Sequence, residues 1–399
     1  MSKPKGFHYT LRRTSPLWKA EEAIEEVVLF CREKRIGEVI WKIDVEEFSH
    51  GLPELSLIDR YVPWLKLAKE RLTEVEVLTS INPWVTLNHQ DRGLDLSEVF
   101  PNMGWMVDYT GASAKSCACP LSSAWQEWLL EAYRRYATVE PNILWVEDDF
   151  RNFNHLPVRY GCFCPRHLEE FSERIGCGIG REDLMGRILK PGPPDPLRAQ
   201  WFDFLGDVMV EVAKRLEKAI HEVSPETRLG LMTSHPWHHS VEGWKWHELL
   251  RALAGPHEPV VRPTLGNYNE VSPLGLYEQS ELMRRTVFCF PRPCRIAPEL
   301  ENFNYTRFSK SVAFTKAQIA LSALMKASEI TMNLFDHMGS PMAFEPGYGR
   351  MLRPSSMPWP TVASPEVWRG ESGSSTTKRP AVSQFSPRKR TTRISSPTT

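Results

Sequence analysis

The sequence lacks the features that mark several large classes of protein. No G-x-G-x-x-G motif follows its first apolar runs, which argues against a dinucleotide-binding fold. It has neither an H-x-H nor an H-E-x-x-H motif, two common patterns of metal-dependent hydrolases. No run approaches the ~20 apolar residues of a membrane span, and the N-terminus has no apolar stretch typical of a secretory signal. We therefore expect a cytoplasmic protein with no membrane partner.

Charge excess of either sign is also missing, because 49 basic residues balance 49 acidic ones. This balance favours neither nucleic acid nor an anionic membrane as a partner. Eight cysteines without a secretory signal indicate a reducing compartment. Clustered cysteines in such a compartment bind metal more often than they form disulfides.

Apolar and aromatic residues are plentiful. The 399 residues are 41% hydrophobic, enough for one large α/β core or two ordinary domains. Fourteen tryptophans are many for this length. They either pack in the core or line a cleft that stacks on the apolar faces of sugars, and composition alone leaves both interpretations open.

Short apolar runs alternate with amphipathic stretches, the pattern of a parallel sheet with crossover helices. Eight strands are predicted to start near Val39, Val75, Trp105, Ile143, Arg228, Val260, Arg295 and Glu329. Helices are predicted over 20–35, 123–138, 199–223 and 309–327. Eight β/α units in about three hundred residues predict a (β/α)8 TIM barrel, with a doubly wound open sheet as the alternative.

The predicted barrel spans residues 1–350. The longest gap between strands contains a cysteine-rich insertion at about 152–198, which we expect on the catalytic face because barrel loops there carry function. Residues 351–399 are rich in Ser, Thr, Pro and Arg without apolar periodicity. This composition predicts a disordered tail, or a chain that is truncated or read out of frame there.

Acids follow two of the predicted strands. Asp148 and Asp149 come directly after the strand that starts at Ile143, and Glu299 and Glu301 share one face of the strand near Arg295. The first pair also fits a solvated loop in which Arg151 is an ion-pair partner. Catalytic groups of α/β barrels come from the C-terminal ends of strands, and glycosidases use two carboxyl groups across the scissile bond.

Other strand ends carry polar and aromatic residues that suit a sugar pocket, where hydroxyl groups need many hydrogen-bond partners. The predicted substrate-binding residues are Asp44, Asn82, Trp84, His89, Asp108, Arg151, His235, Trp237, Asn267, Tyr268, Asp336 and His337.

A cysteine cluster predicts a metal site. Cys162, Cys164 and His167 place three ligand-type side chains within six residues, and the Cys117-Ala118-Cys119 segment offers a fourth. Together they can close a tetrahedral zinc site, with buried free thiols or a redox pair as the alternatives. The role would be structural, because four protein ligands leave no open position, and no catalytic cofactor is expected.

These motifs resemble the β-galactosidases of glycoside hydrolase family forty-two, a member of the retaining clan A, and their uncharacterised barrel relatives. The resemblance runs through Cys119-Pro120, the segment 145–151 and the segment 161–171 (GCFCPRHLEEF). It implies a zinc site that uses Cys119, with His167 where the family has cysteine. It also implies that Asp149 is the acid/base, although this chain has Asp148-Asp149 where the family has Asn-Glu, and that Glu301 is the nucleophile.

The leading hypothesis is therefore a retaining glycoside hydrolase, β-galactosidase-like, acting on a β-linked glycoside or oligosaccharide. Asp149 would protonate the leaving group and Glu301 would attack, with Asp148 and Glu299 as substitutes. One alternative is a non-catalytic carbohydrate-binding barrel. Another is a metal-dependent hydrolase that uses Asp148, Asp149, His235 and His337. A homo-oligomer is allowed in each case.

Overall fold

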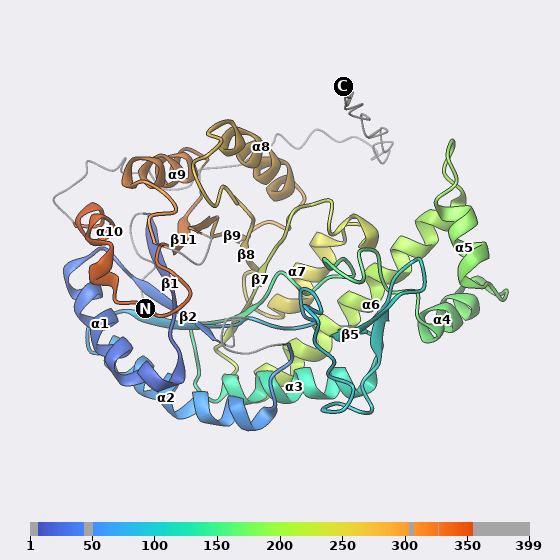
Figure 1. Cartoon of the computed structure of the whole chain (residues 1–399), viewed down its shortest axis with the longest axis horizontal. Helices are drawn as coiled ribbons and strands as arrows, with labels where there is room; N and C mark the ends of the chain where they lie inside the picture. Colours follow the sequence, from blue (N-terminus) through green and yellow to red (C-terminus); the bar gives the residue numbers. More distant parts are fainter. Residues whose placement is uncertain (1–6, 44–50, 303–306, 326, 354–399) are drawn as a thin grey trace, which may run out of the picture. The chain divides into compact units, whose positions relative to one another are not determined.

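The computed structural model describes residues 7–43, 51–302, 307–325 and 327–353 (Figure 1). Its centre is a curled sheet of parallel strands in the order β10-β11-β1-β2-β3-β6-β7-β8-β9. The strands are β1 (His8–Thr14), β2 (Glu38–Ile43), β3 (Leu78–Pro83), β6 (Ile143–Val146), β7 (Arg228–Met232), β8 (Val260–Arg262), β9 (Arg295–Ile296), β10 (Glu299–Glu301) and β11 (Glu329–Asn333).

The sheet closes because β9 and β10 are two halves of one strand. Ala297 lies between β9 and β10, and its N–H donates to the carbonyl of Val261 in β8, at 2.9 Å. On the other side, the Thr331 N–H of β11 donates to the carbonyl of Pro298, at 3.0 Å. The two halves thus join opposite edges of the sheet, and eight strands make a closed barrel. The (β/α)8 prediction is confirmed.

Helices connect the strands, and most of them surround the sheet, while those of the insertion after β6 lie apart from it (Figure 1). They are α1 (Ala20–Glu33), α2 (Leu55–Thr73), α3 (Ser123–Ala137), α4 (Pro165–Ile175), α5 (Arg181–Ile188), α6 (Pro196–His221), α7 (Trp246–Ala254), α8 (Leu274–Phe288), α9 (Val312–Leu324) and α10 (Pro346–Met351). Short 3-10 turns occur at Leu17–Lys19, Ser240–Glu242 and Met342–Phe344. The four helices predicted from sequence are confirmed to within three residues at each end.

One predicted strand is wrong and one was missed. Trp105–Val107 forms β4, which pairs antiparallel with β5 (Ser113–Ala118) outside the barrel. The first barrel strand is instead β1, whose consecutive arginines Arg12 and Arg13 resemble a surface segment in sequence. Both are only 1% exposed. Because these two errors cancel, the strand beginning at Ile143 is still the fourth.

Alternate residues of each strand face the barrel interior, which fills in layers. Along β2, Glu38, Ile40 and Lys42 face inward from the N-terminal to the C-terminal end. At the N-terminal end, Glu38 pairs with Arg295, at 3.3 Å. Ile40 belongs to an apolar middle layer with Trp145, whose indole would overlap any Cβ at Gly230. Lys42 reaches the polar layer at the C-terminal end.

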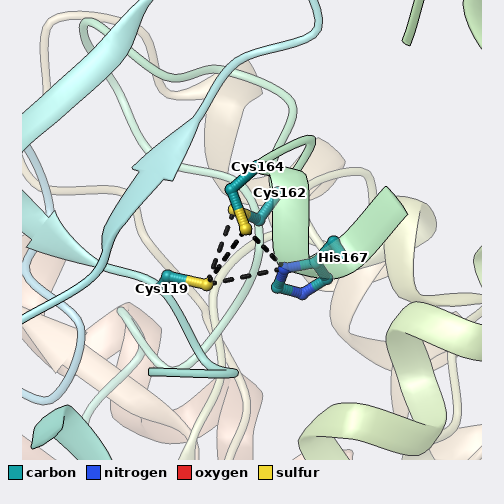
Figure 2. Close-up of side chains that lie close together, drawn as sticks. All are labelled: Cys119, Cys162, Cys164 and His167. Carbon is teal, nitrogen blue, oxygen red and sulfur yellow. Dashed lines mark hydrogen bonds between the residues drawn. The ribbon is translucent and has the colours of Figure 1, made fainter. Parts of the chain in front are cut away.

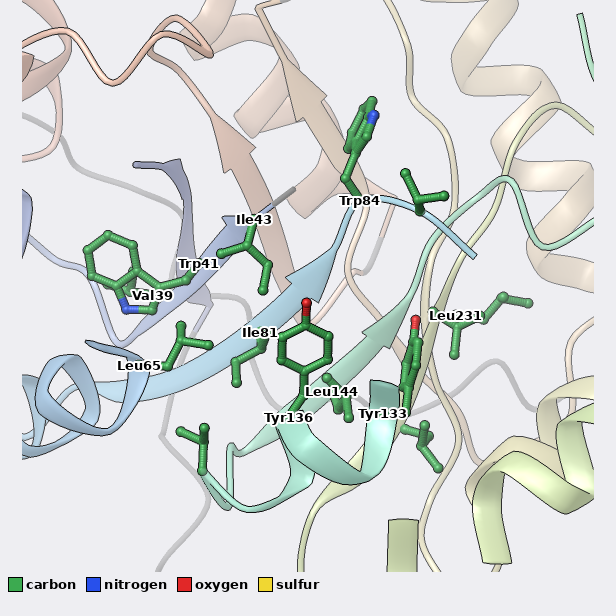
Figure 3. Close-up of a cluster of buried hydrophobic side chains, with 14 of the residues drawn as sticks. Val39, Trp41, Ile43, Leu65, Ile81, Trp84, Tyr133, Tyr136, Leu144 and Leu231 are labelled. Atoms are coloured by element: carbon green, nitrogen blue, oxygen red, sulfur yellow. The ribbon is translucent and has the colours of Figure 1, made fainter. Parts of the chain in front are cut away.

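The residues between these inward-facing ones point outward and form the main hydrophobic core (Figure 3). Val39 and Trp41 of β2 pack toward helix residues such as Leu65, and Ile81 and Leu144 pack near Tyr136. This core fixes the strand ends that carry the candidate site.

The connection after β6 contains the cysteine-rich insertion. It continues into α4 and α5 and packs with the β4–β5 hairpin and the start of α6 around a second hydrophobic cluster. Helix α4 begins at Pro165, directly after Cys164, and ends at Gly176 in the left-handed conformation. The predicted domain limit at residue 350 stays a prediction, and the predicted tail beyond residue 353 lies outside the described residues.

Candidate active site

Acids and cations alternate in the polar layer at the C-terminal end of the barrel. Arg12 of β1 donates to Glu147, at 2.8 Å, and lies 3.4 Å from Glu301. Asn82 also donates to Glu147, at 2.8 Å. Arg262 of β8 contacts Glu147 at 3.3 Å and pairs with Glu299. Carboxylates from the fourth and seventh strands therefore share one guanidinium group.

Glu301 is surrounded by cationic and hydrogen-bonding groups. Lys42 lies 3.8 Å from its carboxylate, His337 lies 3.2 Å away, and Asn333 donates to it at 2.8 Å. Burial alone would raise the pKa of Glu301, but Lys42, His337 and Arg12 outweigh it and hold the pKa well below its usual range. An ionised carboxylate is what a nucleophile requires.

Glu299, two residues earlier on the same face, has the opposite tendency. Burial and the neighbouring Glu301 carboxylate raise its pKa to about 8, against the lowering effect of Arg262. Its carboxyl also accepts a hydrogen bond from Thr264, at 3.1 Å. Paired acids whose pKa values are pushed apart in this way are typical of catalytic sites.

The surroundings of Asp149 differ from those expected for the acid/base that the resemblance implies. Its carboxylate accepts hydrogen bonds from the backbone N–H groups of Thr86, at 2.8 Å, and Asn88, at 2.7 Å, and from the Thr86 hydroxyl. The side chain is completely buried. Burial raises the pKa of Asp149 despite the opposing effect of His89 and Thr86. These contacts hold the loop after β3 against the loop after β6.

Asp148 is the partly exposed member of the three consecutive acids Glu147, Asp148 and Asp149. His89 lies 2.9 Å from its carboxylate and Arg151 lies 3.2 Å away. Burial opposes ionisation, but Arg151 and the hydrogen bond with His89 hold the pKa of Asp148 well below its usual range. Asp148 therefore suits binding or orientation better than proton donation.

Several predicted substrate-binding residues lie around these acids. The Lys42 ammonium lies over the Trp84 ring, 4.2 Å from its centre. Trp84 also stacks on His89, with ring centres 5.1 Å apart. Tyr268 lies close enough to Glu299 for that carboxylate to raise its pKa well above normal. His235 stacks on Trp237, which is half exposed.

Other predicted residues have local structural contacts. Asp108 accepts hydrogen bonds from backbone N–H groups of Thr110, Arg159 and Tyr160, and so ties the β4–β5 hairpin to the insertion. Asp336 accepts from N–H groups in its own turn. Asn267 donates to the carbonyl of Asn269. Asp44 lies outside the described residues.

Several members of the polar layer were not predicted from sequence, among them Arg12, Arg262 and Glu147. Arg12 belongs to the missed strand, and Arg262 follows only two apolar residues in β8. Glu147 was passed over in favour of the two aspartates that follow it. Alternation along β6 carries the signal for Glu147, because it lies two residues after the inward-facing Trp145.

The cysteine cluster forms a compact group of four side chains (Figure 2). The Cys119 sulfur lies 3.7 Å from the sulfurs of both Cys162 and Cys164. The Nδ1 of His167 lies 3.5 Å from the Cys119 sulfur and 3.2 Å from the Cys164 sulfur. Ligands ~2.3 Å from a tetrahedral ion are about 3.8 Å apart, so the group fits a metal ion.

The metal-dependent alternative receives less support. Among the described residues, no group close enough to hold one ion combines Asp148, Asp149, His235 and His337. A different group of His89, Glu147 and Asp148 is compact, but Arg12 and Arg151 bind its two carboxylates. Cations in those positions oppose a metal ion.

Known structures share this architecture. The chain resembles glycosidase barrels. The catalytic domain of β-amylase from Paenibacillus polymyxa aligns over 90% of this chain and 100% of its own length, with 11% identity and a TM-score of 0.55. The β-galactosidase from Halorubrum lacusprofundi aligns over 86% of this chain and 57% of its own length, with 14% identity and a TM-score of 0.55.

Gan42B, a GH42 β-galactosidase from G. stearothermophilus, aligns over 88% of this chain and 56% of its own length, with 12% identity and a TM-score of 0.55. The chain thus spans somewhat more than half of these two β-galactosidases. The predicted resemblance to clan A barrels is confirmed at the level of the fold. No family model and no curated protein matches the sequence. Within the described residues, every helix is too short or too polar to cross a membrane.

Proposed function

We propose that the chain is a retaining glycoside hydrolase acting on a β-linked sugar. The observation that carries this proposal is the sharing of Arg12 by Glu147 and Glu301, acids from the fourth and seventh strands of a glycosidase-like barrel. Fold neighbours that are β-galactosidases make β-galactosides the first substrates to test.

Glu301 is the proposed nucleophile. Its carboxylate is kept ionised, and Lys42 and Arg12 stabilise that charge before attack on the anomeric carbon. The covalent intermediate would then be hydrolysed by water that the acid/base residue activates, which returns the sugar with its original configuration.

Glu147 is the proposed acid/base, in place of the Asp149 predicted from sequence. The raised pKa of Asp149 suits a proton donor. However, Asp149 faces the loop after β3, where it accepts hydrogen bonds from Thr86 and Asn88, whereas Glu147 lies on the same guanidinium as the nucleophile. Geometry takes precedence over pKa in choosing a proton donor.

The decisive experiment measures hydrolysis of aryl β-glycosides by the parent chain and by Glu301→Gln. Loss of the nucleophile should lower turnover about 10³-fold or more while the fold is kept. Glu329→Gln is a matched control, because Glu329 is an equally buried acid paired with Arg295 at the other end of the barrel. Turnover that survives Glu301→Gln would reject the assignment, and the anomeric form of the first product tests retention.

We also propose that Cys119, Cys162, Cys164 and His167 hold a structural zinc ion. Three thiolates and one imidazole are ligands that zinc prefers, and when bound the ion would cross-link the hairpin to α4. The described cysteines are all free thiols, which suits the predicted cytoplasmic location. The predicted homo-oligomer stays a prediction.

A further inference from the structure

A band of rings leads away from the candidate active site across two loops and the β4–β5 hairpin. We call it the aromatic strip, and its members are Tyr109, Phe153, Tyr160, His235, Trp237 and His238. None of its contacts is needed for the roles proposed above for the acids.

The rings form a continuous series. Tyr109 lies 5.8 Å from Tyr160, and Tyr160 lies 5.5 Å from Phe153. Phe153 stacks on His238 with ring centres 4.3 Å apart and planes within 11°. His238 lies 5.6 Å from Trp237. Segments far apart in sequence therefore combine to make one aromatic surface.

Trp237 is the most exposed ring of this surface. One face of its indole stacks on His235, with centres 4.2 Å apart and planes within 8°. The side chain is nevertheless 50% exposed, and Tyr160, next to Tyr109 at the other end, is 45% exposed. Large exposed aromatic rings held in place by stacking are costly in water and are typical of binding surfaces.

The aromatic strip is continuous with the acids through Arg151. Its guanidinium lies 3.2 Å from the Asp148 carboxylate and donates to the carbonyl of Phe153, at 2.7 Å. The backbone N–H of His155 donates to the carbonyl of His89, whose ring contacts Asp148. The aromatic strip therefore begins beside the residues that contact the Asp148 carboxylate.

The two imidazoles of the aromatic strip are neutral. Burial lowers the pKa of His235 to about 4 and that of His238 to about 2. Near neutral pH the aromatic strip therefore presents uncharged π faces. Such faces suit the C–H faces of sugar rings better than a charged ligand.

We propose that the aromatic strip binds the sugar units of an oligosaccharide beyond the unit held at the acids. This inference rests on the proposed function and deepens it, because it makes the natural substrate a chain of several sugars. Exposed Trp237 provides the main stacking platform, and Tyr160 extends the surface toward the insertion.

The test is a binding titration of the full chain, read by calorimetry. Four series of probes are used, one each for galactose, glucose, mannose and xylose. Each series consists of the monosaccharide and the β-linked tetrasaccharide of that one sugar. In at least one series the tetrasaccharide should bind about tenfold more tightly than the monosaccharide, which corresponds to about 1.4 kcal/mol. Trp237→Ala should remove this gain, and Trp237→Phe should keep most of it.

Phe288→Ala is the matched control, because Phe288 is 73% exposed at the end of α8 that leads into the N-terminal end of the seventh strand. It should leave the gain unchanged. Equal affinities for monosaccharide and tetrasaccharide in all four series would overturn the inference, as would a gain that survives Trp237→Ala.

Aryl-glycoside turnover, measured in parallel, separates the two proposals. A gain in binding that depends on Trp237, without any turnover, would support the aromatic strip and reject the glycosidase. Turnover without a gain in tetrasaccharide binding would support the glycosidase and reject the aromatic strip as a binding surface.

Discussion

At the scale of single residues, the acids of the seventh strand show how neighbours set chemical roles. Glu299 and Glu301 are identical side chains on one face of one strand. Glu301 faces Lys42 and His337, whereas Glu299 is left with burial, the negative charge of Glu301 and a single arginine. One acid is therefore held ionised and the other protonated near neutral pH.

Protonated Glu299 makes stability depend on pH. Its pKa rises from 4.5 in the unfolded chain to about 8 in the folded one, so unfolding between these values releases a proton and stability falls as pH rises. Gln at position 299 cannot ionise. The thermal midpoint of Glu299→Gln should therefore rise relative to the parent between about pH 5 and pH 8. A difference independent of pH would contradict the protonated state.

Glu147 and Asp149 can be distinguished by leaving-group dependence. Glu147→Gln should slow substrates with poor leaving groups by about 10²–10⁴-fold and good ones far less, because good leaving groups need little protonation. Asp149→Asn should affect both types equally, since it disturbs the loop held through Thr86 and Asn88. The opposite pattern would restore Asp149 as the acid/base.

The site residues that could be predicted from sequence are those whose position follows from the residues next to them in the chain. Glu301 follows an apolar strand and faces the same way as Glu299, so its position was predictable. The role of Arg12 was not, because its partners Glu147 and Glu301 are 135 and 289 positions away. Only the closed barrel brings such residues together.

At the scale of secondary-structure elements, β1 shows the same limit. Strands with continuous apolar runs, such as β6 and β11, were predicted near their observed starts. In β1, Arg12 and Arg13 conceal a buried strand, and its pairing with β11 at the other end of the chain cannot be read locally. Conversely, Trp105–Val107 has strand-like residues but pairs with a neighbouring hairpin strand.

The two arginines of β1 offer a paired test. Arg12 faces the acids, while Arg13 faces outward to the carbonyl of Ser340 and to Glu26 of α1. Arg12→Met should cost about 3–5 kcal/mol of unfolding free energy, because it removes the cation that two buried carboxylates share, and should abolish turnover. Arg13 is equally buried, and Arg13→Met should lower the unfolding free energy while turnover is kept. Equal loss of turnover in both variants would argue against a role for Arg12 in the site.

At the scale of the whole molecule, the described residues pack around two main hydrophobic clusters. The larger one lies between the barrel strands and their helices. The second joins the β4–β5 hairpin, α4, α5 and the start of α6, and it contains all three cysteines of the metal group. The fourth member of this group, His167, is also buried there, in the first turn of α4. Loss of a metal ion bound by this group would therefore loosen the insertion before the barrel.

Metal removal should consequently act on the insertion first. The purified chain should contain about one zinc ion, and Cys119→Ser should lose it and lower the thermal midpoint by about 5 °C or more. Hydrogen exchange should rise in the segments 105–119 and 161–205 while the barrel strands stay protected. Cys31→Ser is the control, because Cys31 is buried in the main core and should leave zinc content unchanged. Activity should fall only as far as the loosened insertion displaces Arg151 and Asp148. Immediate and complete loss of turnover with an intact insertion would instead indicate a catalytic metal.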